Sequence, residues 1–333
     1  MKLSEWKQFV LMALFTLGLY AFLYFPLDYY IQMPGDAMDA REVVTVPSAD
    51  EDDEGIFMLT VVLGRQANIP SYLWALMQPD HAIYPLEAVI PAQMSDAEYH
   101  EVMLRSMAQS QEIAMALALR QYGYLVEERG EGVYIVEVAD TCTAKDSIFP
   151  GDIIVQIDDV ELHFMPELSE ALRYRLPGEV VSLVLERGEE RLPLSVELSP
   201  KESDPAAGAI GVSCLTYNWS MEFPLEIDIH TKDIGGSSAG LMMTLEMMNQ
   251  LDPEDITAGY RIAGTGTVDL QGNVGEIGGV QQKVIGAIRT KAEYFLVPKE
   301  NYKDASVVAG DVITLVEVAN VADALAFLAT LQP

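Results

Sequence analysis

The segment that most limits how this chain can fold lies near its start. From Gln8 to Leu27 there are 20 residues without a formal charge, mostly Leu, Phe, Ala, Tyr and Val. As a helix, this stretch would be about 30 Å long, which matches the hydrocarbon core of a bilayer. We therefore expect residues 1–7 to form a cytoplasmic tail and residues 8–28 a transmembrane anchor in contact with the lipid bilayer.

A cleavable signal peptide is the rival interpretation of this stretch. Such a signal has a shorter apolar run that ends in small residues, whereas this run ends in FPLDYY, at Tyr30. Lys2 and Lys7 precede the span and Asp28 follows it. The positive-inside rule therefore predicts a single-pass protein of the cell membrane with a cytoplasmic N-terminus and the rest of the chain outside.

The charge of the chain excludes one class of partner. The 333 residues include 20 Lys and Arg against 51 Asp and Glu, a net charge of −31. This charge repels phosphate backbones, so we expect no nucleic acid as a partner. The acidic stretch Asp50–Glu54 is spaced like a calcium loop, but Val61 stands where the loop needs Glu, so we expect a solvated loop.

Only two cysteines are present, Cys142 and Cys214. They cannot form a disulfide framework or a four-cysteine zinc site, and whether they form one bridge stays open. The sequence contains no HExxH run. We expect no metal site and no cofactor.

Two apolar patterns predict elements before residue 125. Phe57–Leu63 is a continuous apolar and β-branched run, which predicts a strand buried on both faces. Met103–Tyr122 has apolar residues at helical spacing on a wide face, which predicts a core helix. Helices and strands mixed along the chain indicate the α+β class.

The pattern changes near Arg129 to short strands, tight turns and one helix, and continues to Leu198. A Pro-Gly-Asp turn at 150–152 precedes an apolar strand, and Pro177 and Gly178 precede a hairpin. These residues resemble a PDZ domain of the kind attached to bacterial proteases. The resemblance implies that the strand GVYIVEV accepts an extended peptide by β-augmentation, with Gly132, Val133 and Tyr134 as peptide-binding residues. The alternative is a small β domain that serves as a spacer.

The segment 224–246 carries the first candidate for chemistry. An alternating strand leads to the glycine turn Gly235–Gly236, and an apolar helical pattern follows from about Ser238. The unsatisfied N–H groups and the dipole of a helix N-terminus favour negative charge, which a serine alkoxide and an oxyanion both carry. An ordinary N-cap role for Ser238 is the alternative.

A base for such a serine would have to come from elsewhere in the chain. A helix is predicted from about Val280, and Lys283 borders its buried stripe beside Val284 and Ile288. To act as a base near neutral pH, the lysine pKa must fall by about three units, which desolvation can supply. A Ser-His-Asp triad is less suitable, because His230 is the only histidine near the serine and is predicted to be structural or at the surface.

Three ordered motifs resemble the proteolytic domain of Lon-type serine proteases: DIGGSSAG (Asp233–Gly240), AGTGTVDLQGNVGEIGGVQQK (Ala263–Lys283) and FLVPKEN (Phe295–Asn301). The resemblance implies that Ser238, not Ser237, is the nucleophile, that Lys283 is the general base, and that Thr265 supports the pair by hydrogen bonding. Backbone N–H groups from Gly236 to Ser238 would hold the oxyanion. Asp233 lies farther from the serine than in Lon and is not carried over, and Ser237 stands where the family often has Pro.

With the anchor and the PDZ-like segment, the whole chain is similar to membrane-anchored, PDZ-containing Lon-like proteases of Gram-positive bacteria. The resemblance implies a protease domain whose N-terminal part is 41–125 and whose Lon-like part is 206–333, with the PDZ-like domain 126–200 inserted. The expected activity is that of a serine endopeptidase outside the membrane that cleaves secreted peptides or unfolded or juxtamembrane protein segments. A homo-oligomer is compatible with this organisation.

Nucleotide is not an expected partner, because no GxxxxGK[ST] run occurs and the chain is therefore expected to work without ATP. Two alternatives to a protease of other proteins stay open. One is a non-catalytic scaffold that binds peptides through its PDZ-like domain, and the other is a protein that processes only itself.

Overall fold

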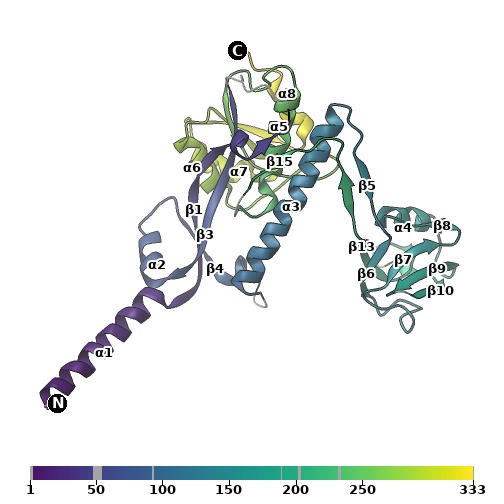
Figure 1. Cartoon of the computed structure of the whole chain (residues 1–333), viewed down its shortest axis with the longest axis horizontal. Helices are drawn as coiled ribbons and strands as arrows, with labels where there is room; N and C mark the ends of the chain where they lie inside the picture. The colour runs from purple at the N-terminus through teal and green to yellow at the C-terminus, as the bar shows by residue number, and fades with distance from the viewer. Residues whose placement is uncertain are drawn as a thin grey trace. The chain divides into compact units, whose positions relative to one another are not determined.

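The computed structural model describes residues 3–47, 55–91, 94–188, 190–201, 204–231 and 234–332. They form two compact units, which are described separately: unit 1 comprises residues 1–125 and 224–333, and unit 2 comprises residues 126–223 (Figure 1). Helices and strands are mixed in the chain, so the predicted α+β class is confirmed. The acidic stretch Asp50–Glu54 lies outside the described residues.

Unit 1 is built on a six-stranded mixed sheet with the order β20-β19-β16-β3-β1-β4. Strands β16, β19 and β20 run parallel to β3, whereas β1 is antiparallel to β3 and β4 is antiparallel to β1. The strands are β1 (Pro26–Asp39), β3 (Ile56–Asn68), β4 (Ala82–Pro85), β16 (Arg261–Gly264), β19 (Tyr294–Pro298) and β20 (Thr314–Val318). Two short pairs flank them: β2 (Val44–Thr45) with β15 (Asp228–Ile229), and β17 (Thr267–Val268) with β18 (Val274–Gly275).

Helices contribute to cores on both faces of this sheet. Phe57 and Leu59 of β3 belong to one core with residues of α3, α5 and α8, while Met58 belongs to a second core with residues of α6 and α7. This alternation confirms the strand predicted at Phe57. The prediction of burial on both faces is wrong for Leu63, which is exposed because the pairing of β16 with β3 ends at Leu59. The helices are α3 (Asp96–Gln121), α5 (Gly240–Leu251), α6 (Val280–Arg289), α7 (Tyr302–Ala309) and α8 (Val321–Leu328).

Helix α3 starts seven residues before the predicted boundary at Met103. Ser95 and Glu98 form a capping box at its N-terminus, in which the Ser95 Oγ accepts from the Glu98 N–H and the Glu98 carboxylate accepts from the Ser95 N–H. The first two turns are polar and therefore invisible to an apolar pattern, but this pair of residues marks a helix start in the sequence.

The chain begins with α1 (Leu3–Tyr24), which leads directly into β1. Its segment Trp6–Tyr24 is long and apolar enough to cross a membrane, and it packs against no core. By length and composition, α1 fits a membrane anchor or a signal sequence. Another short helix of unit 1, α2 (Ile69–Ala75), follows β3.

Unit 2 is a small β-rich fold with the strand order β10-β9-β7-β6-β13, with β8 paired to β7. One apolar core of buried residues fills it, and α4 contributes Leu168 to that core. Both cysteines are free. The elements are β6 (Val133–Val138), β7 (Ile153–Ile157), β8 (Val160–Glu161), α4 (Met165–Leu172), β9 (Val180–Arg187), β10 (Glu190–Glu197) and β13 (Val212–Thr216). Two short strand pairs accompany them: β5 (Glu127–Arg129) pairs with β14 (Ser220–Glu222), and β11 (Ser199–Lys201) pairs with β12 (Asp204–Ala209).

Strand β13 occupies the outer edge of β6. The two strands are antiparallel, from Val212 opposite Val138 to Thr216 opposite Val133. Beyond them, the Tyr217 N–H donates to the Gly132 carbonyl at 2.8 Å, which continues the ribbon. Since β7 pairs with the other side of β6, both edges of β6 are taken.

This arrangement predicts slow hydrogen exchange in a segment that the sequence analysis assigned to the Lon-like part, 206–333. In the full chain, amides of residues 212–217 should be protected about as strongly as those of β6, because the ladder shields both. Hydrogen exchange with mass spectrometry on peptides covering 131–138 and 210–218 measures this. Fast exchange in 212–217 with protection kept in β6 would contradict the described ladder.

Candidate active site

Ser238 lies in a single 3-10 turn, Ser237–Ala239, directly before α5. The sequence predicted a helix from about Ser238, and the α-helix itself starts two residues later, at Gly240. The Ser238 carbonyl is held by two donors, the Gly266 N–H at 2.9 Å and the Thr265 hydroxyl at 3.0 Å. The side chain is half-buried, so its hydroxyl is fixed in position and still reachable.

The glycine turn before the serine requires glycine for two different reasons. Gly236 has φ of +89°, which side-chain-bearing residues rarely adopt. A Cβ at Gly235 would lie 2.7 Å from the Cβ of Met103 on α3. The Gly236 N–H donates to the Met103 carbonyl at 2.8 Å, and Ser110 of α3 donates its hydroxyl to the Ser237 carbonyl at 3.1 Å. These two hydrogen bonds therefore hold the turn against α3.

These bonds correct one part of the sequence prediction. The Gly236 N–H is already used by Met103 and cannot also bind an oxyanion. The first N–H groups of a helical turn have no acceptor within the turn. The amides of Ser237 and Ser238 are therefore the ones that can receive negative charge.

Lys283 of α6 reaches across from the second core to the serine. Its Nζ lies 2.8 Å from the Ser238 Oγ, 3.0 Å from the Thr265 Oγ1 and 3.2 Å from the Thr60 carbonyl oxygen. Only 4% of the residue is exposed. Three segments far apart in the sequence thus surround one amine: β3, the turn before α5 and the loop after β16.

Burial lowers the pKa of the Lys283 amine from its usual range to about 7. The physical cause is desolvation, since a charged ammonium loses its hydration inside the protein. Among the described residues, no carboxylate forms an ion pair with Lys283. The acceptors around the amine offset only part of the lost hydration, so a neutral amine is available near physiological pH.

Thr265 contacts both Ser238 and Lys283. Its hydroxyl donates to the Ser238 carbonyl and is left with lone pairs that accept from Lys283. It is almost fully buried. The carbonyl of Thr60, by contrast, was missed by the sequence analysis, because a backbone acceptor carries no side-chain signal.

An open cleft of about 930 Å³ leads to this group of residues. Its walls come from β1, β3, α3 and the turn that carries Ser238, and all of these lie in unit 1. His230 also lines the cleft, but among the described residues no hydrogen bond joins its ring to Ser238. Asp233 lies outside the described residues. The site therefore has a serine, a lysine and a threonine in contact, without a histidine between them.

The residues predicted to bind peptide in unit 2 do not form an open site. The carbonyl of Gly132 accepts from Tyr217, and the N–H of Gly132 donates to the His163 carbonyl at 3.2 Å. Val133 and Tyr134 pair with β13 on one side and with β7 on the other. The prediction that this strand presents a free edge is wrong, because the chain's own residues 212–217 already occupy it.

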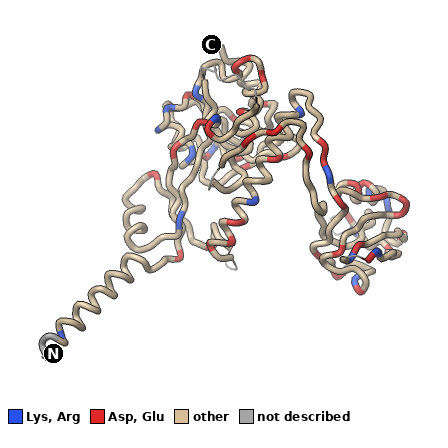
Figure 2. The backbone as a smooth tube through the Cα atoms, viewed as in Figure 1, with Lys and Arg blue, Asp and Glu red and all other residues tan. Residues whose placement is uncertain are grey.

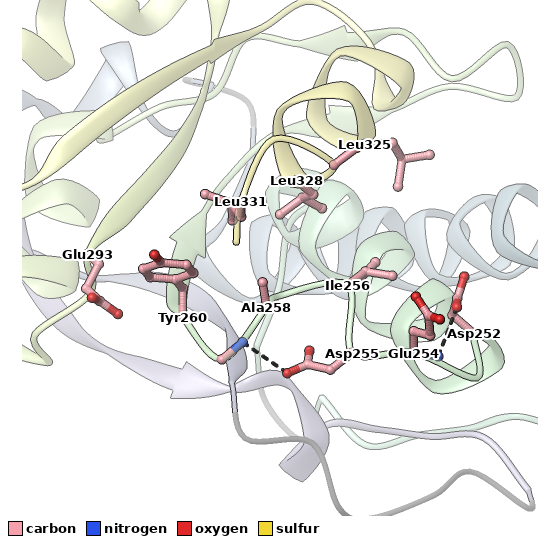
Figure 3. A pocket seen from close by; sticks show the side chains of 12 residues that line it. Asp252, Glu254, Asp255, Ile256, Ala258, Tyr260, Glu293, Leu325, Leu328 and Leu331 are labelled. Atoms are coloured by element: carbon pink, nitrogen blue, oxygen red, sulfur yellow. Dashed lines mark hydrogen bonds between the residues drawn. The ribbon is translucent and has the colours of Figure 1, made fainter. Parts of the chain in front are cut away.

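A second hollow, of about 920 Å³, lies between the end of α5 and α8. Figure 3 shows the carboxylates that line it. Three of these accept hydrogen bonds from backbone amides: Asp255 from Gly259, Asp252 from Glu254 and Glu293 from Arg261. None of the predicted site residues lines it. Across the described parts of the chain, no group of three or more His, Cys, Asp or Glu could hold a metal ion.

Comparison with known proteins gives two family matches. Residues 206–330 match the Lon protease (S16) C-terminal proteolytic domain, and residues 116–198 match the PDZ domain. A Lon protease of Clostridium acetobutylicum is 31% identical over 135 residues, 37% of this chain and 17% of that protein. A Lon protease of Brucella suis is 23% identical over 321 residues, 91% of this chain and 37% of that protein. The chain thus spans well under half the length of these relatives.

Among solved structures, the PDZ domain of an SdrC-like protein from Listeria monocytogenes is similar at 22% identity and a TM-score of 0.23. The match covers 25% of this chain and 87% of the Listeria chain.

The buried amine predicts a pH-dependent cost in stability. Above about pH 10.5, Lys283 is neutral in both the folded and unfolded states, and as the pH falls to about 7 only the unfolded state gains the proton, so stability is lost over this window. Replacing Lys283 by Met should therefore stabilise the protein at pH 7 by about 2 kcal/mol, after roughly 1 kcal/mol is subtracted for each lost hydrogen bond. Thermal unfolding of both proteins at pH 7, 8.5 and 10 measures the difference, which should fall to about zero near pH 8.5 and change sign by pH 10, where the lost hydrogen bonds outweigh the small remaining cost of the buried amine. A difference independent of pH would contradict the buried neutral amine.

Proposed function

Because this chain carries a Lon-type proteolytic domain and a PDZ domain, we propose that it is a membrane-anchored serine endopeptidase with Ser238 as nucleophile and Lys283 as general base. The observation that supports this most strongly is the 2.8 Å separation of the Lys283 Nζ from the Ser238 Oγ, with the amine buried. A base must lie within hydrogen-bonding reach of the proton that it removes and must have a suitable pKa.

The hydrogen bonds of Lys283 orient its lone pair. A neutral amine has two N–H bonds and one lone pair, and the carbonyl of Thr60 and the hydroxyl of Thr265 accept the two N–H bonds. The lone pair is then left for the third neighbour, the Ser238 hydroxyl, which donates its proton to the amine. Thr60 and Thr265 are therefore positioning groups for the base.

The reaction follows the order of acyl transfer. Ser238 loses its proton to the Lys283 amine while its Oγ bonds to the peptide carbonyl carbon, and the carbonyl oxygen takes up negative charge. In this proposal, the amides of Ser237 and Ser238 receive that charge. The ammonium of Lys283 then gives its proton to the leaving amine, and water, deprotonated by the same lysine, releases the acyl group from Ser238.

The substrates that suit this site are short or unfolded polypeptides. The cleft is open and lies within one unit, so an extended chain can enter without a machine to unfold it. No nucleotide-binding run occurs in this sequence, and none of the proposed steps uses ATP. In this proposal, unit 2 is an inserted PDZ domain, and the covered edge of β6 means that peptides do not add to that edge while β13 is in place.

The helix α1 is proposed as the anchor. Its apolar segment Trp6–Tyr24 packs against no core and continues without a break into the first strand of the catalytic sheet. With Lys7 on the cytoplasmic side, the positive-inside rule places the remaining chain outside the membrane. A removed signal sequence is the alternative for this helix.

Substitution at the two reacting groups tests the proposal. In the full chain, purified in detergent, Ser238→Ala and Lys283→Met should each lower cleavage of an unstructured polypeptide by about a thousandfold or more. Ser237→Ala is the matched control and should keep activity within a few fold, because the parts of Ser237 with a role in the site are its backbone carbonyl and amide, which alanine keeps. Gel and mass analysis of substrate and enzyme distinguish cleavage of other chains from self-processing. If the wild type cuts nothing, the scaffold alternative is favoured.

The pH profile reports on the base itself. The neutral form of Lys283 is the active one, so the rate should rise with pH through a midpoint at about 7 and level off above it. Thr265→Val removes an acceptor that favours the ammonium, so it should slow cleavage and move the midpoint to lower pH. Initial rates at constant ionic strength measure both. A falling rate above pH 7, or a midpoint unmoved in Thr265→Val, would contradict the role of the amine.

A further inference from the structure

An uncharged segment stands out in this very acidic chain. Residues 66–79, QANIPSYLWALMQP, contain no formal charge, although 21% of the chain is charged. They hold the end of β3, helix α2 and the turn after it. The side chains that form what we call the α2 patch are exposed: Leu73 51%, Trp74 44%, Leu76 61% and Met77 72%. Large apolar side chains gathered at one place on a surface mark a contact with something apolar.

The α2 patch is joined directly to the end of α1. The Asn68 side chain caps α2 by accepting from the Ser71 N–H, and its Nδ2 donates to the Leu23 carbonyl in the last turn of α1 at 2.8 Å. Nearby, the Gln66 Nε2 donates to the Leu27 carbonyl at 3.1 Å. Figure 1 shows α2 beside the point where α1 passes into β1. A bilayer that contains α1 therefore has α2 at its boundary.

Aromatic side chains surround this junction. Tyr24, Phe25 and Tyr29 are exposed where α1 leads into β1, and Tyr84 is exposed on the neighbouring strand β4. The ring of Tyr29 packs on Tyr72 of α2, with centroids 4.9 Å apart. Tyrosine and tryptophan concentrate at the boundary between lipid and water, where the ring is in lipid and its polar atom is in water.

We propose that the α2 patch lies in the interfacial layer of the same bilayer that α1 spans, as a second contact of unit 1 with lipid. This rests on the proposed anchoring by α1. The tube in Figure 2 is free of charged residues along α2 and along α1 beyond Lys7, whereas acidic residues are frequent elsewhere. A lipid surface fits this patch better than a protein partner, because α2 is hydrogen-bonded to the last turn of α1 and the exposed side chains of both helices are mostly apolar.

The contact sets a distance between the bilayer and the reacting serine. Strand β3 runs from Asn68 at the start of α2 to Thr60, whose carbonyl accepts from Lys283, and its residues from Leu63 to Gln66 line the cleft. Eight residues of extended strand span about 26 Å. A membrane protein segment that leaves the bilayer beside α2 can follow β3 to Ser238. The substrate class inferred is therefore membrane-anchored polypeptide, cut about eight or more extended residues from the lipid.

Tryptophan fluorescence tests the lipid contact without relying on activity. The chain has three tryptophans, Trp6, Trp74 and Trp219. The full chain carrying Trp6→Phe and Trp219→Phe keeps Trp74 as its one tryptophan. We place it in vesicles of phosphatidylcholine and phosphatidylglycerol that contain lipids brominated near the headgroup. Trp74 should then lose about half of its emission. The control carrying Trp74→Phe and Trp219→Phe reports Trp6 in the span. Quenching of Trp6 without quenching of Trp74 would overturn the second contact, and quenching of neither would also overturn the anchor.

Cleavage assays test the inferred substrate class. The triple variant carries Leu73→Gln, Leu76→Gln and Met77→Gln. It should cleave a vesicle-tethered unstructured substrate about tenfold more slowly, because the distance of the cleft from the lipid is no longer fixed. Its cleavage of the same substrate in solution should be unchanged. The matched control is Val307→Gln with Val312→Gln, two similarly exposed apolar residues elsewhere in unit 1, and it should change neither. Equal effects on both substrates would overturn the inference. If the wild type cleaves neither, the proposed function fails, and Trp74 quenching still decides the lipid contact.

Discussion

The proposed chemistry depends on the Lys283 amine being shielded from water. The Lys283 side chain is buried beneath the sheet of unit 1, and its three polar neighbours come from β3, from the loop after β16 and from the turn before α5. An amine that loses its hydration costs stability, and a fold can keep it there only if the surrounding elements cannot open. The cores on both faces of the sheet provide that rigidity, with Phe57 and Met58 filling opposite sides of the strand that carries Thr60. The same packing holds the serine turn against α3, so Ser238 and Lys283, the proposed nucleophile and base, are positioned by one continuous body.

Much of this site is visible in the sequence, and the reason is local. The glycine turn at Gly236, the helical pattern after Ser238 and the apolar stripe beside Lys283 can each be recognised from neighbouring residues. Their roles in one site came only from the resemblance of three ordered motifs to Lon-type proteases. Thr60 could not be recognised, because its contribution is a carbonyl oxygen brought in from more than 200 residues away. The polar first turns of α3 were missed for a different reason, since they carry no apolar pattern, although the Ser95 and Glu98 pair marked them.

The pairing of β6 shows where sequence patterns stop being informative. The alternation in 133–138 predicts a strand correctly, but a strand pattern does not say which neighbour it has. Val212 and Cys214 face the core of unit 2 and fill the position that an added peptide would take. Both segments alternate equally well, and only the return of the chain from β12 brings them together. The domain type was therefore predicted correctly, while the open edge assigned to it was not.

In the proposed function, the covered edge of β6 leaves a larger role in presenting substrate to the bilayer. When a protein cannot concentrate peptides at a binding edge, confining enzyme and substrate to one surface raises their effective concentration by geometry alone. The charge of the chain acts against close approach to an anionic surface, since most of the net charge of −31 lies outside the span. Contact with lipid is then favourable only where charge is absent and apolar side chains are exposed. Residues 66–79 meet both conditions, and they lie at the end of the strand that leads to the reacting serine.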